Sequence, residues 1–168
     1  MAIVVKVQDA DFDVGAELAA MRIGKPTVGA IASFIGIVRD VNAVTGDDGL
    51  QHSAQVGTLT LEHYPGMTER ALEDICVEAT GRWSLIDLLV IHRHGTLLPT
   101  DQIVFVAASS AHRGEAFDAC NFVMDYLKTQ APFWKKETTD RGERWVEARD
   151  SDEAAAARWR VAAVRQDT

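Results

Sequence analysis

The sequence predicts an α+β fold, because runs typical of strands and two amphipathic helical segments alternate without a regular βαβ order. The chain has 168 residues, which is the length of one domain. Its composition, 47% hydrophobic and 25% charged residues, is typical of a folded globular protein and excludes a disordered chain. We therefore expect a single domain spanning residues 1–168.

The first part of the chain predicts two strands and a short helix. Ile3 to Val7 is a short strand, and Val14 to Met21 has weak helical periodicity. The segment Val28 to Val38 is rich in β-branched residues and predicts a buried strand that ends at Arg39. Residues 42–57 are polar with three glycines, so we expect a long loop there.

The middle of the chain predicts a half-buried strand, a helix and two further strands. Apolar and polar residues alternate from Thr58 to His63, as on a strand with one buried face. Thr68 is suited to cap a helix that runs to about Arg82. Strands are expected at 85–92 and 103–108.

The last part of the chain predicts a helix, a hairpin and a terminal helix. Ser109 or Ser110 is expected to cap the second long helix, which Pro132 stops, so that Lys128 lies in its last turn. Residues 133–136 and 144–148 predict a hairpin. A C-terminal helix and tail are expected over 150–168, with acidic residues at the helix start.

Positive charge is concentrated in a chain that is acidic overall. The net charge is −8, which disfavours a surface that binds nucleic acid or anionic lipid. Yet one short stretch holds five basic residues: Lys128, Lys135, Lys136, Arg141 and Arg144. Such a cluster is either an anion site, where Arg and Lys bind phosphate or carboxylate, or a solvated surface. Arg39 and the pair His112-Arg113, at expected strand and helix ends, are further candidates for the anion site.

The two lysines that flank Pro132-Phe133-Trp134 could act in either of two ways. Lysine near aromatic and cationic groups can become a nucleophile or an acid–base group. A helix C-terminus instead favours the charged ammonium at Lys128, which suits an electrostatic role for Lys128 and Lys135.

The sequence offers little for metal or thiol chemistry. His92 and His94 could form half of a metal site or be an incidental pair, and no carboxylate or cysteine cluster completes a site. Cys76 and Cys120 are far apart and lie among apolar residues, as expected of buried free thiols in a reducing compartment. The N-terminus lacks the features of a signal peptide, so we expect a soluble, cytoplasmic protein.

Four longer stretches resemble one known family. They are LTLEHYPGMTERAL (59–72), IHRHGTLLPTDQIVFVAASSAHRGEAFDAC (91–120), FVMDYLKTQAPFWKKE (122–137) and RWVEARDSD (144–152). They are similar to the MoaE family, the large catalytic subunits of molybdopterin synthase. The resemblance extends from about Ile31 to Trp159.

The resemblance implies a fold, a reaction and partners. The fold is an α/β hammerhead with an additional antiparallel β subdomain. The reaction is a sulfur transfer to cyclic pyranopterin monophosphate that forms the dithiolene of molybdopterin, without a metal or cofactor. The sulfur donor is a small ubiquitin-like carrier with a C-terminal Gly-Gly thiocarboxylate. Two large subunits form a homodimer, and with two carriers they form a heterotetramer.

The resemblance also implies roles for particular residues. Lys128 and Lys135 match the family's catalytic lysines. The residues that match its substrate-binding positions are Ile37, Val38, Arg39, His112, Arg113, Lys128, Lys135, Lys136 and Glu137. Ile37 stands where some relatives have lysine, so only its backbone would serve. The alternative function is a non-catalytic module that binds a ubiquitin-like tail or a phosphorylated ligand.

Overall fold

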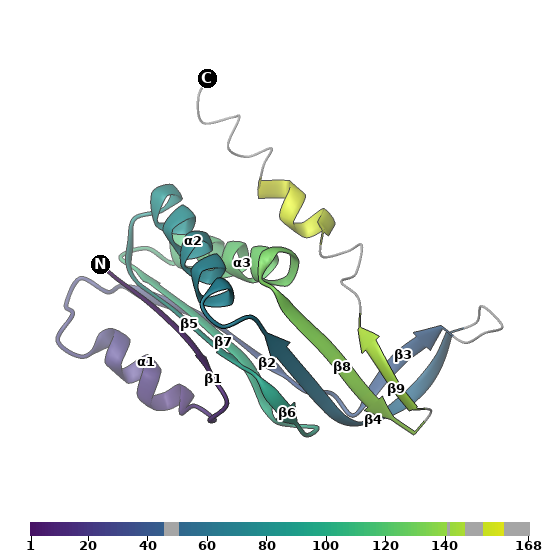
Figure 1. Ribbon diagram of the computed structural model, residues 1–168. Helices are drawn as coiled ribbons and strands as arrows, with labels where there is room; N and C mark the ends of the chain where they lie inside the picture. The colour runs from purple at the N-terminus through teal and green to yellow at the C-terminus, as the bar shows by residue number, and fades with distance from the viewer. Residues whose placement is uncertain (46–50, 141, 147–152, 160–168) are drawn as a thin grey trace.

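A four-stranded sheet forms the centre of the computed structural model, which describes residues 1–45, 51–140, 142–146 and 153–159 (Figure 1). Its strands, in spatial order, are β1 (Ala2–Gln8), β5 (Leu85–Arg93), β7 (Gln102–Ser110) and β2 (Ala30–Ile37). β1 pairs with β5 in parallel, and the other two pairs are antiparallel. The strands predicted for these segments are confirmed.

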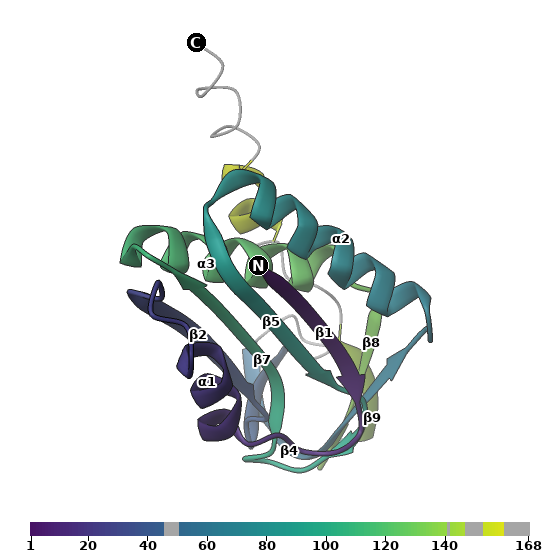
Figure 2. The same ribbon diagram turned by 90° about the vertical axis from the view of Figure 1, so that its left-hand side faces the viewer.

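Helices cover both faces of this sheet. α2 (Met67–Arg82) and α3 (Arg113–Gln130) lie on one face, and the shorter α1 (Val14–Arg22) lies on the other (Figure 2). In β5, Leu88 and Val90 belong to the core under α2 and α3, whereas Leu89 and Ile91 belong to the core under α1. This alternation explains why the central strands are apolar on both sides.

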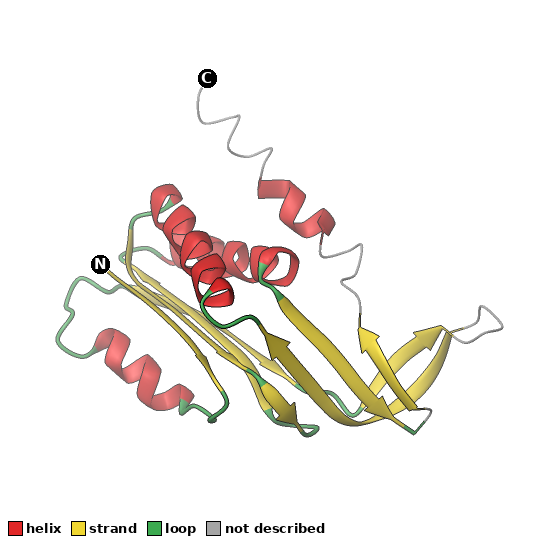
Figure 3. Ribbon diagram, viewed as in Figure 1, coloured by secondary structure: helices red, strands yellow, loops and turns green. Residues whose placement is uncertain are grey.

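A second, antiparallel sheet extends away from the first, toward the lower right of Figure 3. Its strands are β3 (Val41–Thr45), β4 (Gln51–His63), β8 (Phe133–Thr139) and β9 (Gly142–Val146), and the short β6 (Gly95–Leu97) also pairs with β4. Val38 packs against Leu59, Leu61 and Leu97 in a small core where the two sheets meet. The predicted α+β class and the hairpin of β8 and β9 are confirmed.

The loop predicted at 42–57 is wrong for the described residues. Val41–Thr45 pairs with Gln51–Gln55 as an antiparallel ribbon. Val41, Ser53 and Gln55 lie on one face of the ribbon and are all exposed, so this face imposes no apolar–polar alternation on the sequence. Residues 46–50 lie outside the described part of the chain.

The predicted helix caps also differ from the structure. α2 begins after Gly66, whose φ of 81° suits glycine, and the Glu69 carboxylate accepts a hydrogen bond from the Gly66 N–H at 2.6 Å. Thr68 therefore lies within the helix. Ser109 and Ser110 belong to β7, and His112 precedes α3. Ser110 still supports this end, because its Oγ accepts a hydrogen bond from the His112 N–H at 3.2 Å.

The predicted C-terminal helix is seen over 153–159. Trp159 packs edge-on against Trp83 and Phe122, and its Nε1 donates to Asp125 at 2.7 Å, which docks this helix on α2 and α3. Its predicted start at Asp150, the tail beyond 159, and the hairpin residues 147–148 lie outside the described residues. No helix in the described ranges is long and apolar enough to cross a membrane.

Thr68 ties the start of α2 to the segment that leads into β8. Its Oγ accepts from the Tyr64 N–H at 3.1 Å and donates to the Pro132 carbonyl at 3.3 Å, and the side chain is fully buried. We expect Thr68→Val to lower the free energy of unfolding by about 1–3 kcal/mol, because two backbone groups lose their partner. Urea denaturation measures this change.

Thr80→Val on the same helix is the matched control. Thr80 donates only to the Val77 carbonyl at the helix surface, so we expect a change within about 0.5 kcal/mol. Equal destabilisation by the two substitutions would contradict the linking role of Thr68.

Candidate active site

Helix α3 carries two groups of candidate residues, one at each end. His112 and Arg113 stand exposed at its N-terminus, and Lys128 stands exposed in its last turn, as predicted. An α-helix rises 1.5 Å per residue, so Arg113 and Lys128 are separated by about 22 Å along the axis. One chain therefore does not bring these two groups together.

Arg39 follows β2 at the opposite end of the first sheet from His112. The pairing of Ala30 with Ser110 and of Ile37 with Gln102 shows that β2 ends where β7 begins. The register shifts between Gly36 and Ile37, and a Cβ on Gly36 would stand 2.7 Å from a methyl group of Val104. Gly36 thus permits the bulge that redirects the chain toward Arg39.

Val38 holds Arg39 in place through its backbone. Its N–H donates to the Asp101 carbonyl, and its carbonyl accepts from the Thr100 N–H, each at 2.9 Å. The Val38 N–H is therefore engaged within the protein, while the Ile37 side chain is exposed. In this structure Val38 acts on the site by fixing Arg39.

Lys135 and Glu137 lie on the inner face of the second sheet. In the register of β4 and β8, Leu61 is opposite Lys135 and Leu59 is opposite Glu137, and directly opposite residues share a face. Both leucines belong to the small core with Val38. Lys135 is half-buried and Glu137 is buried, so this face combines an apolar floor with two ionisable groups.

Arg144 is a residue of this face that the sequence did not single out as a site residue. It lies opposite Glu137 on β9, and its Nε and Nη2 donate to Glu137 Oε2 at 3.0 and 2.7 Å. Such a pairing is what a buried carboxylate requires. The only signal in the sequence was its place in the basic stretch.

Lys136 lies on the opposite face of the same strand. It pairs with Trp145 in register, and its Nζ is 3.3 Å from Glu143 Oε2 at the surface. The alternation of a strand thus separates Lys136 from Lys135 and Glu137.

The structure thus gathers part of the predicted set. Arg39, Lys135 and Glu137 border the junction between the two sheets, around the core that contains Val38. Lys128 ends the helix that leads into β8. His112 and Arg113 are at the far end of α3.

The two histidines of the candidate metal pair have separate surroundings. His92 is buried with its ring stacked on Phe133, whereas His94 packs against His63 with ring centroids 4.5 Å apart. Burial, together with the charge of Lys135, lowers the pKa of His92 to about 3. Within the described ranges, no three His, Cys, Asp or Glu side chains are grouped to hold a metal ion.

Neither cysteine is placed to act as a nucleophile. Both are free and buried, and burial raises the pKa of Cys76 to about 12 and that of Cys120 to about 11. Because the thiolate is the reactive form, these thiols are inert near neutral pH.

Comparison with known proteins identifies the family. Residues 7–130 match the family model described as MoaE protein. The chain is 60% identical, over 94% of its length and 84% of the relative's, to the molybdopterin synthase catalytic subunit of Ralstonia nicotianae. It is 56% identical to that of Pseudomonas aeruginosa, over 92% and 97% of the two chains.

Solved structures agree with this assignment. The molybdopterin biosynthesis MoaE protein from Burkholderia ambifaria has a TM-score of 0.76 and 55% identity, covering 95% of this chain and 98% of that one. A complex of subunits 1 and 2 of molybdopterin-converting factor from Helicobacter pylori contains a chain with a TM-score of 0.65, 19% identity and coverage of 86% and 91%. At that identity the likeness concerns the fold alone.

The chain belongs to the MoaE family. Its function is that of the catalytic subunit of molybdopterin synthase, in the biosynthesis of the molybdenum cofactor. The two-sheet architecture expected from the resemblance is that of MoaE structures.

Two ion pairs cross the β8–β9 hairpin and differ in burial, so they should differ in strength. Arg144 binds a Glu137 side chain that is 5% exposed, whereas Lys136 binds a Glu143 side chain that is 62% exposed. We expect Arg144→Met to lower the free energy of unfolding by about 2–4 kcal/mol, because it leaves a buried carboxylate without its guanidinium.

Lys136→Met is the matched control, with an expected change within about 1 kcal/mol, as for surface pairs. Thermal unfolding of both variants at one pH measures the difference. Equal destabilisation would show that the Arg144–Glu137 pair stabilises the protein no more than the exposed Lys136–Glu143 pair does.

Proposed function

We propose that this chain transfers sulfur from the C-terminal thiocarboxylate of a ubiquitin-like carrier to cyclic pyranopterin monophosphate, with Lys128 and Lys135 as the catalytic cations. The observation that carries the proposal is the placement of these ammonium groups. One ends α3 and the other lies at the start of β8 on the inner face of the second sheet. The segment that joins them is short, so both lysines adjoin the same turn.

The chemistry needs positive charge at two stages. The thiocarboxylate sulfur attacks a carbon of the pterin side chain while the bond from that carbon to its oxygen substituent breaks. The oxygen leaves with the bonding electron pair and takes up a proton, and a thioester-like link between carrier and substrate results. Water then cleaves the acyl–sulfur bond, releasing the carrier as a carboxylate and leaving sulfur on the pterin. The attacking group and the intermediate of hydrolysis both carry negative charge, which fixed ammonium groups stabilise.

The phosphate of the substrate requires its own cations. Arg39, His112 and Arg113 are the proposed ligands, because arginine binds phosphate with paired, charge-assisted hydrogen bonds. Lys136 and Glu137 continue the same substrate-binding strand, with Glu137 held by Arg144. The backbone of Ile37 and Val38 leads into Arg39 and fixes its position.

A second copy of the chain would complete this site. Arg113 is about 22 Å from Lys128 along α3, too far for one small substrate to contact both within a chain. In a two-fold dimer, the N-terminus of one α3 can lie beside the C-terminus of the other. We therefore propose a homodimer whose sites take His112 and Arg113 from the partner copy.

The edge strand β2 supports an interface of this kind. Phe34, Ile35 and Ile37 are exposed large apolar residues on a strand that is paired on one side only in the first sheet. Exposed apolar edges of this type mark association surfaces. With one carrier bound to each copy, the proposed assembly is a heterotetramer, in line with the two-subunit complex from Helicobacter pylori.

We propose the cytoplasm as the site of action. Cys76 and Cys120 are both free and buried, which suits a reducing compartment.

Lys128→Ala tests the proposed chemistry. Lys128 is exposed, so its truncation removes little packing. We expect the single-turnover rate with thiocarboxylated carrier and cyclic pyranopterin monophosphate to fall at least about a hundredfold, the effect of removing one donor that stabilises developing charge. Gln130→Ala, exposed in the same last turn, should keep the wild-type rate.

Carrier affinity, measured by calorimetry, should change little in Lys128→Ala. A folded variant with near wild-type turnover would refute the catalytic role. Turnover absent in the wild type, with carrier binding intact, would instead favour the non-catalytic binding module.

A mixed dimer tests the shared site. Lys128→Ala and Arg113→Ala chains, co-expressed with different tags and purified through both, form dimers in which one site has both defects and the other has none. We expect about half of the wild-type activity per dimer, because one of two sites is intact. Activity no higher than that of the two parent variants would place the whole site within one chain.

A further inference from the structure

His92 lies where the two sheets and the end of α3 meet. Its ring stacks on Phe133 with centroids 3.7 Å apart and an interplanar angle of 17°. Phe133 is the first residue of β8 and pairs with His63 of β4. Because side chains alternate along a strand, Phe133 and Lys135 point to the same face. The His92 ring thus contacts Phe133, which lies two residues before Lys135 on the same face of the strand.

The His92 ring is itself anchored. Its Nδ1 lies 2.8 Å from the Arg93 carbonyl, and a carbonyl only accepts, so Nδ1 carries the proton and Nε2 is an acceptor. The side chain is 2% exposed. This hydrogen bond therefore fixes the tautomer of His92 and the plane of the ring that stacks on Phe133.

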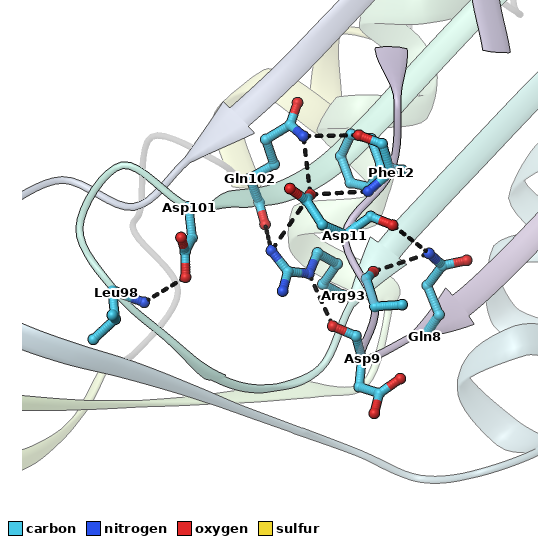
Figure 4. A network of polar contacts seen from close by, with 9 residues as sticks. Gln8, Asp9, Asp11, Phe12, Arg93, Leu98, Asp101 and Gln102 are labelled. Carbon is cyan, nitrogen blue, oxygen red and sulfur yellow. Dashed lines mark hydrogen bonds and ion pairs between the residues drawn. The ribbon is translucent and has the colours of Figure 1, made fainter. Parts of the chain in front are cut away.

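The residue that accepts this hydrogen bond is held by a polar network (Figure 4). The Arg93 guanidinium donates to the carbonyls of Asp9 and Gln102 at 3.0 and 3.1 Å, and its Nη1 is 3.5 Å from the Asp11 carboxylate. Gln102 in turn donates to Asp11 and to the Phe12 carbonyl, each at 2.9 Å. The end of β5 is thereby tied to the start of β7 and to the segment that precedes α1.

We propose that His92 is a positioning residue for Lys135: its ring, anchored to the Arg93 carbonyl and stacked on Phe133, fixes the first residues of β8 and so the place of the Lys135 side chain. The proposal rests on the role proposed above for Lys135.

The charge state of His92 supports this role. Burial is the main cause that lowers the pKa of His92 to about 3. The hydrogen bond to the Arg93 carbonyl acts in the opposite direction, and the charges of Lys135, His63 and His94 add to the lowering. Glu69 of α2 is an acidic neighbour of this cluster, with a carboxylate oxygen 3.9 Å from His63 Nε2. The imidazole is therefore neutral near pH 7, so it holds the strand without adding a positive charge next to Lys135.

Amine footprinting of the full-length protein tests the proposal without relying on sulfur transfer. An acylating reagent labels Lys135 and Lys136, and their labelling rates are compared by mass spectrometry, with Lys136 on the outer face as the internal reference. In His92→Leu, which loses the stack and the hydrogen bond, we expect the Lys135 to Lys136 ratio to change at least about threefold, because the strand start is released. An unchanged ratio in a folded variant overturns the proposal.

His94→Leu is the matched control. It removes a histidine at the same end of the sheet, and its ring contact is with His63. The labelling ratio should equal that of the wild type. A ratio that shifts as much as in His92→Leu would show that loss of any nearby imidazole suffices, and would overturn the positioning role.

A double-mutant cycle provides the functional readout. In single-turnover sulfur transfer, His92→Leu should lower the rate about ten- to a hundredfold, as small misplacements of a catalytic group do. The same substitution in a Lys135→Arg background should lower the rate much less, because its effect acts through the lysine. If the rate reductions caused by the His92 and Lys135 substitutions simply multiply in the double variant, His92 does not act through Lys135. This result would overturn the proposal.

One outcome separates the failure of the proposed function from the failure of this proposal. If Lys135→Arg and Lys135→Ala keep the wild-type rate, the catalytic role of Lys135 fails whatever the footprint shows. Should His92→Leu not fold, His92→Phe is measured instead. It keeps an aromatic ring against Phe133 and loses the hydrogen bond that anchors the ring to Arg93. A smaller change of the labelling ratio in the same direction is expected, and an unchanged ratio overturns the proposal.

Discussion

The burial of one face of α3 is the constraint on which the rest of the molecule depends. The helix follows β7 directly, packs across the first sheet and leads into β8 of the second. Its buried face includes Ala116, Cys120, Val123 and Leu127, which recur at helical spacing. Because this stripe fixes the axis, it also fixes where the two ends of the helix stand. The positions of Arg113 and Lys128 are thus consequences of packing in the core.

This constraint has a consequence for function. A rigid helix of 18 residues presents its N-terminal end, with His112 and Arg113, and its C-terminal Lys128 to opposite sides of the subunit. Side-chain flexibility cannot close a gap of about 22 Å. A substrate that needs both groups must therefore be held between molecules, and two-fold symmetry is the simplest way to bring unlike helix ends together. In the proposed dimer, the association of the two chains is thus part of the proposed chemistry.

The sequence predicted most of the elements because they have a buried face. β5, β7, α2 and α3 are embedded in cores, and burial imposes a periodic spacing of apolar residues on their sequences. The ribbon of β3 and the first half of β4 was missed because its described residues are largely exposed, so polar composition there suggested a loop. Thr68 was misplaced because a threonine before an apolar run is usually a cap, whereas Gly66 begins the helix here.

The candidate site was predictable as a list of residues but not as an arrangement. The resemblance supplied Arg39, His112, Arg113 and the lysines. The expected helix already placed His112-Arg113 and Lys128 near its two ends, but no linear motif shows which strands lie beside each end. Strand alternation could have shown that Lys135 and Lys136 face opposite sides. The contacts of Arg144 with Glu137 and of His92 with Phe133 join distant segments, so they emerge only from the fold.

The inner face of the second sheet shows how an acidic protein can keep a cationic site. The whole chain carries a net charge of −8, which repels anionic ligands at long range. Salt screens that repulsion between exposed charges beyond about 10 Å, so short-range contacts decide whether an anion binds. Beside Lys135, Glu137 is bound by two donors of Arg144, and His92 is neutral because it is buried. The charge of Glu137 is therefore balanced by the Arg144 guanidinium, and His92 carries no charge. These two neighbours therefore add little net charge to the proposed site around Lys135.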